Sequence, residues 1–336
     1  MMDAELNTSH GLVLQGGGAL GAFELGAARV IYNRDCTFRP GVLAGVSIGA
    51  ISAALLGRPA RGLKPLEALE TFWQRVTATS LVPPTLQPYA SLVGLPNFFT
   101  INPFWMFGTS LYSVEPLRRT LSELVDVDRL ADQAARPHLV FTATDVRRGQ
   151  LATFSSLERP LTLDHVLASG SLPPSFPMTT IDNVAYWDGG LFDNTPLGAL
   201  IDLLEGEDRA AAVVNLFPNK IETLPRSMTE VGQHCLNLLF ANKTASDVKL
   251  MKRFDAVADL MAELEKLPAD SPVRDLPSFK ALAKADYKRV PTIVEITRSS
   301  PAEQLEASDF SHAGIERRAD EGRSIARDAL RAKGFL

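Results

Sequence analysis

Near the N-terminus, short runs of apolar residues alternate with stretches whose apolar positions follow a helical spacing. The runs at 11–15 and 41–46 are too short for helices and are typical of buried strands. The stretches 19–32 and 48–57 each place apolar side chains along a helix. Strand, helix, strand and helix within fewer than 50 residues predict a right-handed parallel βαβ unit.

The same two patterns return after residue 58, less regularly at first. Further strands are predicted at 138–144, 149–155, 184–187, 211–217 and 291–297. Helices are predicted at 64–79 and 113–124, through much of 226–288, and at 311–333. The last helix carries mixed charges, which we interpret as a solvated face rather than a membrane anchor.

Residues 58–135 form an aromatic-rich insertion that interrupts the alternation of strands and helices. Its segment 98–112 contains Phe98, Phe99, Phe104, Trp105, Phe107 and Tyr112, interrupted by a proline. One interpretation is an irregular loop whose aromatic side chains complete the core. The other is a lid or entrance for an acyl chain, and the pattern is compatible with both.

Composition and charge indicate a globular protein and argue against some classes of partner. Hydrophobic residues make up 46% of the 336 and charged residues 22%, as in a globular protein, and we find no repeat or linker that would divide the chain. A net charge of −5 argues against nucleic acid as a partner. The two cysteines, Cys36 and Cys235, are expected to be buried thiols in a reducing compartment.

The N-terminal residues lack the pattern of a signal peptide, and no stretch has the ~18 uncharged apolar residues of a spanning helix. We therefore expect a cytoplasmic protein that does not cross a membrane. Its oligomeric state does not follow from the sequence.

The loop after the first predicted strand is rich in glycine. Gly16, Gly18 and Gly21 satisfy G-x-G-x-x-G, the fingerprint of a dinucleotide-binding turn. In a dinucleotide-binding fold the second strand ends near an acidic residue for the ribose, whereas here it ends at Ser47. We therefore expect the amides of this loop to form an oxyanion hole beside Ser47, with a nucleotide-binding oxidoreductase as the alternative.

Gly45-Val46-Ser47-Ile48-Gly49 is a G-x-S-x-G motif between a predicted strand and a predicted helix, the context of a nucleophile elbow. Such a turn strains Ser47 and presents its hydroxyl above the sheet. Gly45 and Gly49 are needed because a Cβ at either position would collide with a neighbouring strand or helix.

A candidate base follows at the end of another short strand, in Tyr186-Trp187-Asp188-Gly189-Gly190. Gly189 and Gly190 allow a tight turn beside the carboxylate. Asp188 could take the Ser47 proton if the two were hydrogen-bonded. Because an ordinary aspartate is a weak base at neutral pH, the site should be partly dry.

A histidine base is the alternative, as in an α/β-hydrolase-like esterase or an acyltransferase. None of the histidines stands in a motif that looks catalytic; they are His10, His138, His165, His234 and His312. His234 and His312 follow Asp188 in the chain order of an α/β-hydrolase, and His165 is the best placed locally. An acyltransferase of the malonyl-carrier type is expected to have histidine where Val46 stands.

Four motifs together resemble the patatin-like phospholipases. These are the glycine loop 16–21, the elbow 45–49, the Pro-rich segment 168–177 and the Asp-Gly-Gly turn 188–190, in the family's order. The resemblance covers residues 11–215. It implies a three-layer α/β/α fold with a mostly parallel central sheet, and hydrolysis of acyl esters without metal or cofactor.

The resemblance also assigns roles to residues. It implies a Ser-Asp dyad, with Ser47 as nucleophile and Asp188 as proton acceptor. The oxyanion hole would come from the glycine loop, with Gly17 and Gly18 as principal donors and its residues Gly16, Gly17, Gly18, Ala19 and Gly21. Leu20 stands where many members have a basic residue, so a preference for anionic head groups is not implied.

Residues 216–336 lie outside the resemblance. We expect a mostly helical C-terminal region with a final strand at 291–297, packed on the same domain. The sequence as a whole predicts a lipid acyl hydrolase that contacts a membrane surface transiently. A non-catalytic lipid-binding protein is the remaining alternative.

Overall fold

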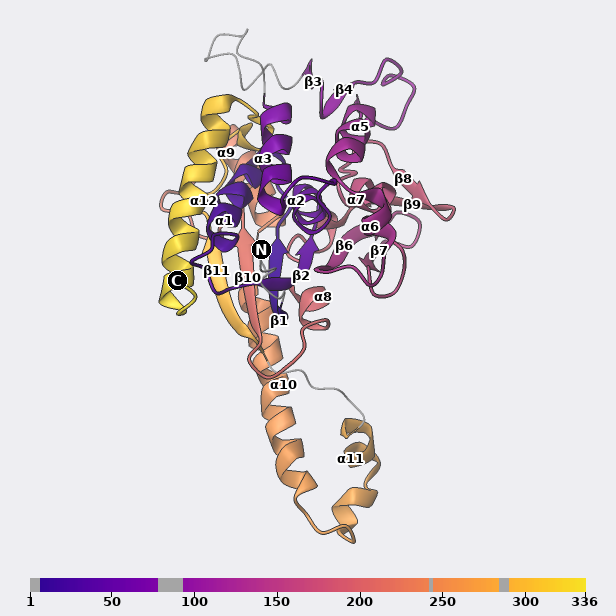
Figure 1. Ribbon diagram of the computed structural model, residues 1–336, viewed down its shortest axis with the longest axis vertical. Helices are drawn as coiled ribbons and strands as arrows, with labels where there is room; N and C mark the ends of the chain where they lie inside the picture. Colours follow the sequence, from indigo (N-terminus) through magenta and orange to yellow (C-terminus); the bar gives the residue numbers. More distant parts are fainter. Residues whose placement is uncertain (1–6, 78–92, 242–243, 284–289) are drawn as a thin grey trace.

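The computed structural model describes residues 7–77, 93–241, 244–283 and 290–336 (Figure 1). Its main sheet has eight strands: β1 (Asn7–Leu14), β2 (Pro40–Gly45), β6 (His138–Asp145), β7 (Gln150–Ser155), β8 (Thr179–Ile181), β9 (Val184–Asp188), β10 (Ala210–Asn215) and β11 (Thr292–Thr297). The order is β11-β10-β1-β2-β6-β9-β8, and β7 pairs with β6. The strands from β11 to β6 are parallel, whereas β7, β8 and β9 run antiparallel to their neighbours.

The helices are α1 (Ala22–Ile31), α2 (Ile48–Gly57), α3 (Pro65–Val76), α5 (Glu115–Leu124), α6 (Val127–Ala131), α7 (Leu163–Ser169), α8 (Leu197–Ile201), α9 (Met228–Leu239), α10 (Thr244–Glu265), α11 (Pro277–Leu282) and α12 (His312–Ala332). Short 3-10 turns include η1 (Gly18–Gly21) and η6 (Glu306–Ser308). The predicted helix 48–57 is α2, and residues 78–79 of the predicted helix 64–79 lie outside the described residues.

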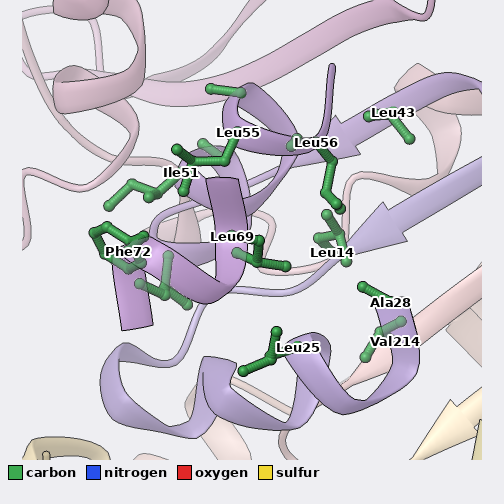
Figure 2. Close-up of a cluster of buried hydrophobic side chains, with 14 of the residues drawn as sticks. Leu14, Leu25, Ala28, Leu43, Ile51, Leu55, Leu56, Leu69, Phe72 and Val214 are labelled. Atoms are coloured by element: carbon green, nitrogen blue, oxygen red, sulfur yellow. The ribbon is translucent and has the colours of Figure 1, made fainter. Parts of the chain in front are cut away.

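Both faces of the parallel sheet are covered, which explains the continuous apolar runs of its strands. Leu12 and Leu14 of β1 belong to a large core with α1, α2, α3 and α12, whereas Val13 packs on the other face with α8. Figure 2 shows part of the large core, where Leu14 and Val214 of the sheet meet Leu25 of α1. The predicted three-layer α/β/α fold with a mostly parallel sheet is confirmed.

The C-terminal helix α12 lies directly on α1 (Figure 1). A Cβ on Gly26 would lie 1.9 Å from the Ala319 carbonyl oxygen, and one on Gly322 would lie 2.1 Å from the Phe23 carbonyl oxygen. Glycine at these two positions therefore lets the two backbones touch. The opposite face of α12 is charged and exposed, as predicted, but Arg318 is fully buried.

The aromatic-rich segment contains a small antiparallel sheet of β3 (Gly94–Leu95), β4 (Phe99–Ile101) and β5 (Tyr112–Ser113). The core interpretation is confirmed for part of the segment, and the interpretation as a lid or entrance stays a prediction. Phe98, Phe99 and Tyr112 are buried in the large core. The residues between β4 and β5 project from the molecule, with Phe104 to Phe107 exposed.

The expectation of two buried thiols is wrong for one cysteine. Cys36 is buried behind α1, but Cys235 is exposed. It lies on α9, whose side chains are mostly solvent-accessible although many of them are apolar. None of the helices in the described ranges is long and apolar enough to span a membrane.

Candidate active site

The glycine loop and the serine turn lie side by side because β1 and β2 are parallel neighbours. Leu14 pairs with Gly45, so the loops that follow the two strands leave the sheet at the same edge. A Cβ on Gly16 would lie only 2.9 Å from the Ser47 Cβ. The glycine loop therefore passes directly beside the serine.

The turn at Ser47 has the geometry expected of a nucleophile elbow. Ser47 has φ 57° and ψ −125°, a conformation that L-residues rarely adopt. Its amide donates to the Ser169 carbonyl oxygen at 3.1 Å and to the Ser169 Oγ at 3.0 Å, which fixes the turn against the end of α7. A Cβ on Gly45 would lie 2.2 Å from the Gly49 carbonyl oxygen, and one on Gly49 would lie 2.1 Å from that of Leu14.

The pairing of β6 with β2 and β9 places Asp188 near the turn at Ser47. β6 continues past the end of β2: Phe141 pairs with Gly45, and two residues later Ala143 pairs with Asp188. Because β7 occupies the other edge of β6, β9 must lie on the same side as β2. The antiparallel β9 therefore ends with its carboxylate beyond the end of β2, where Ser47 lies.

The Asp188 carboxylate is in the environment that a base needs. The residue is only 2% exposed, and burial raises the pKa of its carboxyl group to about 6. Hydrogen bonds from the Ser47 side chain and the Gly190 amide, the latter 2.7 Å from Oδ1, lower the pKa and limit the rise. The carboxylate is thus mostly ionised at neutral pH and more basic than an exposed aspartate.

The residues after Asp188 are glycines for steric reasons. A Cβ on Gly189 would lie 2.5 Å from the Thr142 carbonyl oxygen, and one on Gly190 would lie 2.7 Å from the Asn194 Oδ1. Because Gly189 lies so close to β6, Asp188 stays next to this strand, near the ends of the parallel strands where Ser47 lies.

The amides of Gly17 and Gly18 are free to bind a ligand. Within the described ranges, no backbone or side-chain acceptor takes a hydrogen bond from either amide. Gly18 has φ 58°, which favours glycine. Ala19 and Gly21 are not among the residues that line the cavity described below. A Cβ on Gly21 would lie 2.7 Å from the Ile48 Cγ1.

Gly16, Gly17, Gly18, Ser47 and Asp188 line one cavity of about 370 Å³. Its remaining walls are mostly apolar and come from distant parts of the chain. They include Phe98, Phe99 and Tyr112 of the aromatic-rich segment, Leu236 and Phe240 at α9, and Leu305, Ala307 and Phe310 near η6. A cavity of this size and character suits an apolar ligand whose reacting group lies at the glycine loop.

Asn194 is a site residue that the sequence analysis missed. Its Nδ2 donates to the Gly16 carbonyl oxygen at 3.1 Å and to that of Phe240 at 3.0 Å. It thus ties the glycine loop to the end of α9 while lining the cavity itself. Its place six residues after Asp188, shortly after the glycine turn, was the available signal.

Gln15 is a second residue that the sequence analysis missed. It precedes the glycine loop directly, and its hydrogen bonds stabilise the start of that loop. Its Nε2 donates to Thr195 Oγ1 at 2.9 Å, and its Oε1 accepts from the amides of Leu216 and Phe217. This fully buried side chain therefore joins the ends of β1 and β10.

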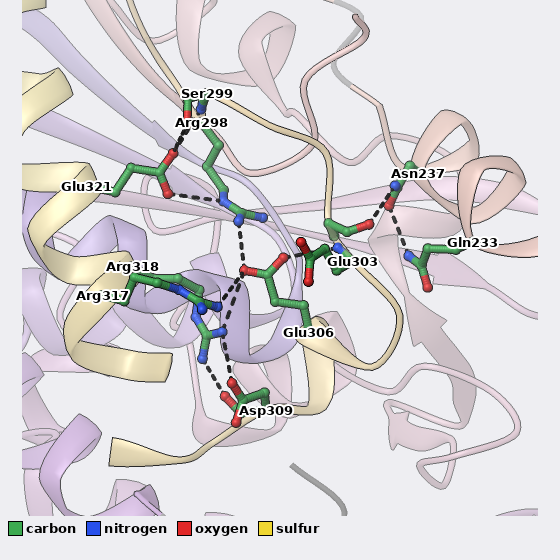
Figure 3. Close-up of polar contacts among 11 residues, drawn as sticks. Gln233, Asn237, Arg298, Ser299, Glu303, Glu306, Asp309, Arg317, Arg318 and Glu321 are labelled. Atoms are coloured by element: carbon green, nitrogen blue, oxygen red, sulfur yellow. Dashed lines mark hydrogen bonds and ion pairs between the residues drawn. The ribbon is translucent and has the colours of Figure 1, made fainter. Parts of the chain in front are cut away.

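The wall near η6 is held by a buried ionic cluster (Figure 3). Glu306 pairs with Arg298 at 2.8 Å and with Arg318 at 3.7 Å, and Arg318 also pairs with Asp309 at 3.5 Å. The carbonyl oxygen of Ala307, inside this segment, would lie 2.5 Å from a Cβ on Gly18. The ionic cluster thus holds η6 in contact with the glycine loop.

Replacing Arg318 with methionine is expected to lower the free energy of unfolding by about 3–5 kcal/mol. The change keeps much of the side-chain volume but leaves Glu306 and Asp309 buried without one of their cationic partners. Urea unfolding measures the effect, and Arg327→Met, at an exposed position of the same helix, is the matched control. Equal stability of the two variants would contradict a structural role for the ionic cluster.

All five histidines belong to the described residues, and none lines the cavity. His10 stacks on Phe38, and His165 packs edge-on against Phe154 with its pKa lowered by burial. The geometry therefore offers Ser47 no histidine partner within the cavity. Among the described residues there is also no group of three or more side chains suited to hold a metal ion.

Comparisons with known proteins identify the family of the chain. Residues 12–201 match a family model described as patatin-like phospholipase, and residues 238–336 match a second one described as patatin phospholipase. No curated protein sequence matches the chain. Among solved structures, VipD from Legionella pneumophila is similar at 15% identity and a TM-score of 0.41, over 96% of this chain and 67% of that one.

Proposed function

Since this chain belongs to the patatin-like phospholipase family, we propose that it hydrolyses acyl esters of lipids with Ser47 as nucleophile and Asp188 as base. The observation that carries the proposal is a buried carboxylate, hydrogen-bonded to a strained serine, in an apolar cavity. The expected Ser-Asp dyad and glycine-loop oxyanion hole are part of this proposal.

In the first step, the Ser47 Oγ attacks the ester carbonyl carbon while Asp188 accepts the hydroxyl proton. The carbonyl oxygen takes the negative charge, and the amides of Gly17 and Gly18 are the donors available to it. The tetrahedral intermediate collapses to an acyl-serine, and Asp188 returns the proton to the departing alcohol.

In the second step, Asp188 takes a proton from water as the water oxygen attacks the acyl-serine. The products are the fatty acid and free Ser47, which regains its proton from Asp188. A single carboxylate can serve both steps because its raised pKa lies near the pH at which it works.

The shape of the cavity supports a lipid as the acyl donor. The aromatic side chains of Phe98, Phe99 and Phe310 line it together with leucines, and Asp188 and the glycine loop lie beside Ser47. Such a wall would desolvate an acyl chain and would leave the ester at the polar end.

A fluorophosphonate probe tests the proposal, because it forms a stable bond with an activated serine. Mass spectrometry of the labelled protein should locate the probe on Ser47. The labelling rate should fall about tenfold per pH unit below pH 6, since Asp188 must be ionised to accept the proton. Asp188→Asn should remove both the fast labelling and this pH dependence.

Two outcomes would overturn the proposal. A folded protein that takes no label would favour a non-catalytic lipid-binding role. A label on Ser47 whose rate depends on His234 or His312 instead of Asp188 would favour the histidine-dependent alternative.

A further inference from the structure

Large apolar side chains project into solvent at the last residue of β4 and at four successive positions between β4 and β5. We call them the aromatic tip: Ile101 is 46% exposed, Phe104 72%, Trp105 51%, Met106 71% and Phe107 93%. Single exposed apolar residues are common on proteins, but four in succession form a patch of the kind that binds a partner.

The aromatic tip is held outward by its own hydrogen bonds. The Asn102 amide donates to the Leu111 carbonyl oxygen at 2.9 Å, and the Asn102 Oδ1 accepts from the Phe104 amide at 3.0 Å. The Phe107 amide closes a further turn onto the Phe104 carbonyl oxygen at 2.9 Å. The apolar side chains are therefore presented on an ordered turn, which lowers the entropic cost of binding.

The aromatic tip is also fixed to the wall of the cavity. The amides of Leu111 and Tyr112 donate to the carbonyl oxygens of Pro174 and Ser175, at 3.0 and 2.8 Å. Tyr112 and Ser175 line the cavity that contains Ser47. In Figure 1, β3, β4 and the loop that follows project from the upper end of the molecule. A surface that touched the aromatic tip would thus meet the protein next to a wall of this cavity.

The chemistry of the segment fits a lipid surface better than a protein. The sequence has no charged residue from 76 to 114, and the aromatic tip combines tryptophan, phenylalanine and methionine. Protein interfaces add arginine and a polar rim to such aromatic groups. Tryptophan and phenylalanine without charge prefer the boundary between water and acyl chains.

We infer that the aromatic tip inserts into the surface of a zwitterionic lipid bilayer and places the entrance of the Ser47 cavity against it. This inference rests on the proposed function in so far as the substrate is a lipid. The partner is the aggregated lipid surface itself, and the attraction is apolar rather than electrostatic.

Vesicles of phosphatidylcholine test the inference, with Trp105 as the reporter. Trp73 is buried and Trp187 is partly buried, so a blue shift of the emission on adding vesicles should come from Trp105. The double variant Phe104→Ser/Phe107→Ser should bind the vesicles at least about tenfold more weakly, because two inserted side chains are lost. Raising the salt concentration should change binding little, since no charge takes part.

A matched control and a soluble substrate separate this inference from the proposed function. Leu260→Ser/Leu276→Ser removes two exposed apolar side chains, 55% and 49% exposed, from the α10–α11 region and should leave vesicle binding unchanged. A short-chain soluble ester should be hydrolysed equally well by the wild type and the Phe104/Phe107 variant, whereas hydrolysis of vesicle lipid by the variant should fall at least tenfold.

Equal vesicle binding by wild type and variant would overturn the inference. So would a wild-type dimer that dissociates in the variant without lipid, which would assign the aromatic tip to a second copy of the chain. Vesicle binding without hydrolysis of either substrate would instead refute the proposed function and leave the docking surface standing.

Discussion

Ser47→Ala is expected to lower the turnover of an acyl ester by about 10⁴-fold or more. Alanine keeps the Cβ that the strained turn already accommodates, so the fold should survive. The reaction loses the atom that forms the acyl intermediate, and the glycine-loop amides alone cannot replace it. Steady-state hydrolysis of a soluble short-chain ester measures the loss.

Ser175→Ala is the control for this substitution, because Ser175 also lines the cavity but contributes only its backbone carbonyl to a described contact. It should retain nearly all of the activity. Circular dichroism and urea unfolding verify that both variants are folded. Substantial turnover by a folded Ser47→Ala protein would refute the assignment of the nucleophile.

Asp188→Asn is expected to reduce turnover by about a thousandfold or more and, at the same time, to stabilise the protein at neutral pH. Burial raises the pKa of Asp188 from 3.8 to about 6, so the ionised carboxylate opposes folding above that pH. A raised pKa contributes stability that is fully present below 3.8 and is lost as the pH rises through about 6. The corresponding cost is about 3 kcal/mol at most above pH 6.

The measurement is the free energy of unfolding in urea for both proteins, at pH 8 and near pH 4. Asparagine has no charge to bury and can still accept from the Gly190 amide, so the variant should be more stable at pH 8 and should lose this advantage near pH 4. Asp208→Asn, at an exposed aspartate, should show no such difference. A variant that is less stable than wild type at pH 8 would contradict the cost assigned to the buried charge.

The parts of the fold that could be predicted are those with a local cause. The central strands appear as continuous apolar runs because both of their faces are buried. Gly45 and Gly49 were predictable as well, since the clash that a side chain would cause is with the turn itself or with the adjacent strand. The nearness of Gly16 to Ser47 was predictable because the two parallel strands of a βαβ unit end side by side.

The parts that could not be predicted depend on distant segments. Nothing near Leu305 indicates that η6 will cover the glycine loop, because that contact depends on how the ionic cluster closes. Arg318 stands in a helix with many charged residues, and only packing against the body of the protein selects it for burial. The split of the aromatic-rich segment into buried Phe98 and exposed Phe107 likewise depends on where its small sheet is placed.

The wall supplied by η6 has a consequence for the newly made chain. Gly18 and Ala307 are in contact but stand 289 positions apart in the sequence. At the usual 5–20 residues per second, a ribosome needs roughly 15–60 s to pass from one to the other. Ser47 is made early in that interval, whereas the wall that η6 adds to the cavity is made only at its end. A lipid-hydrolysing site that is completed only late in translation therefore stays incomplete while the chain is still being made.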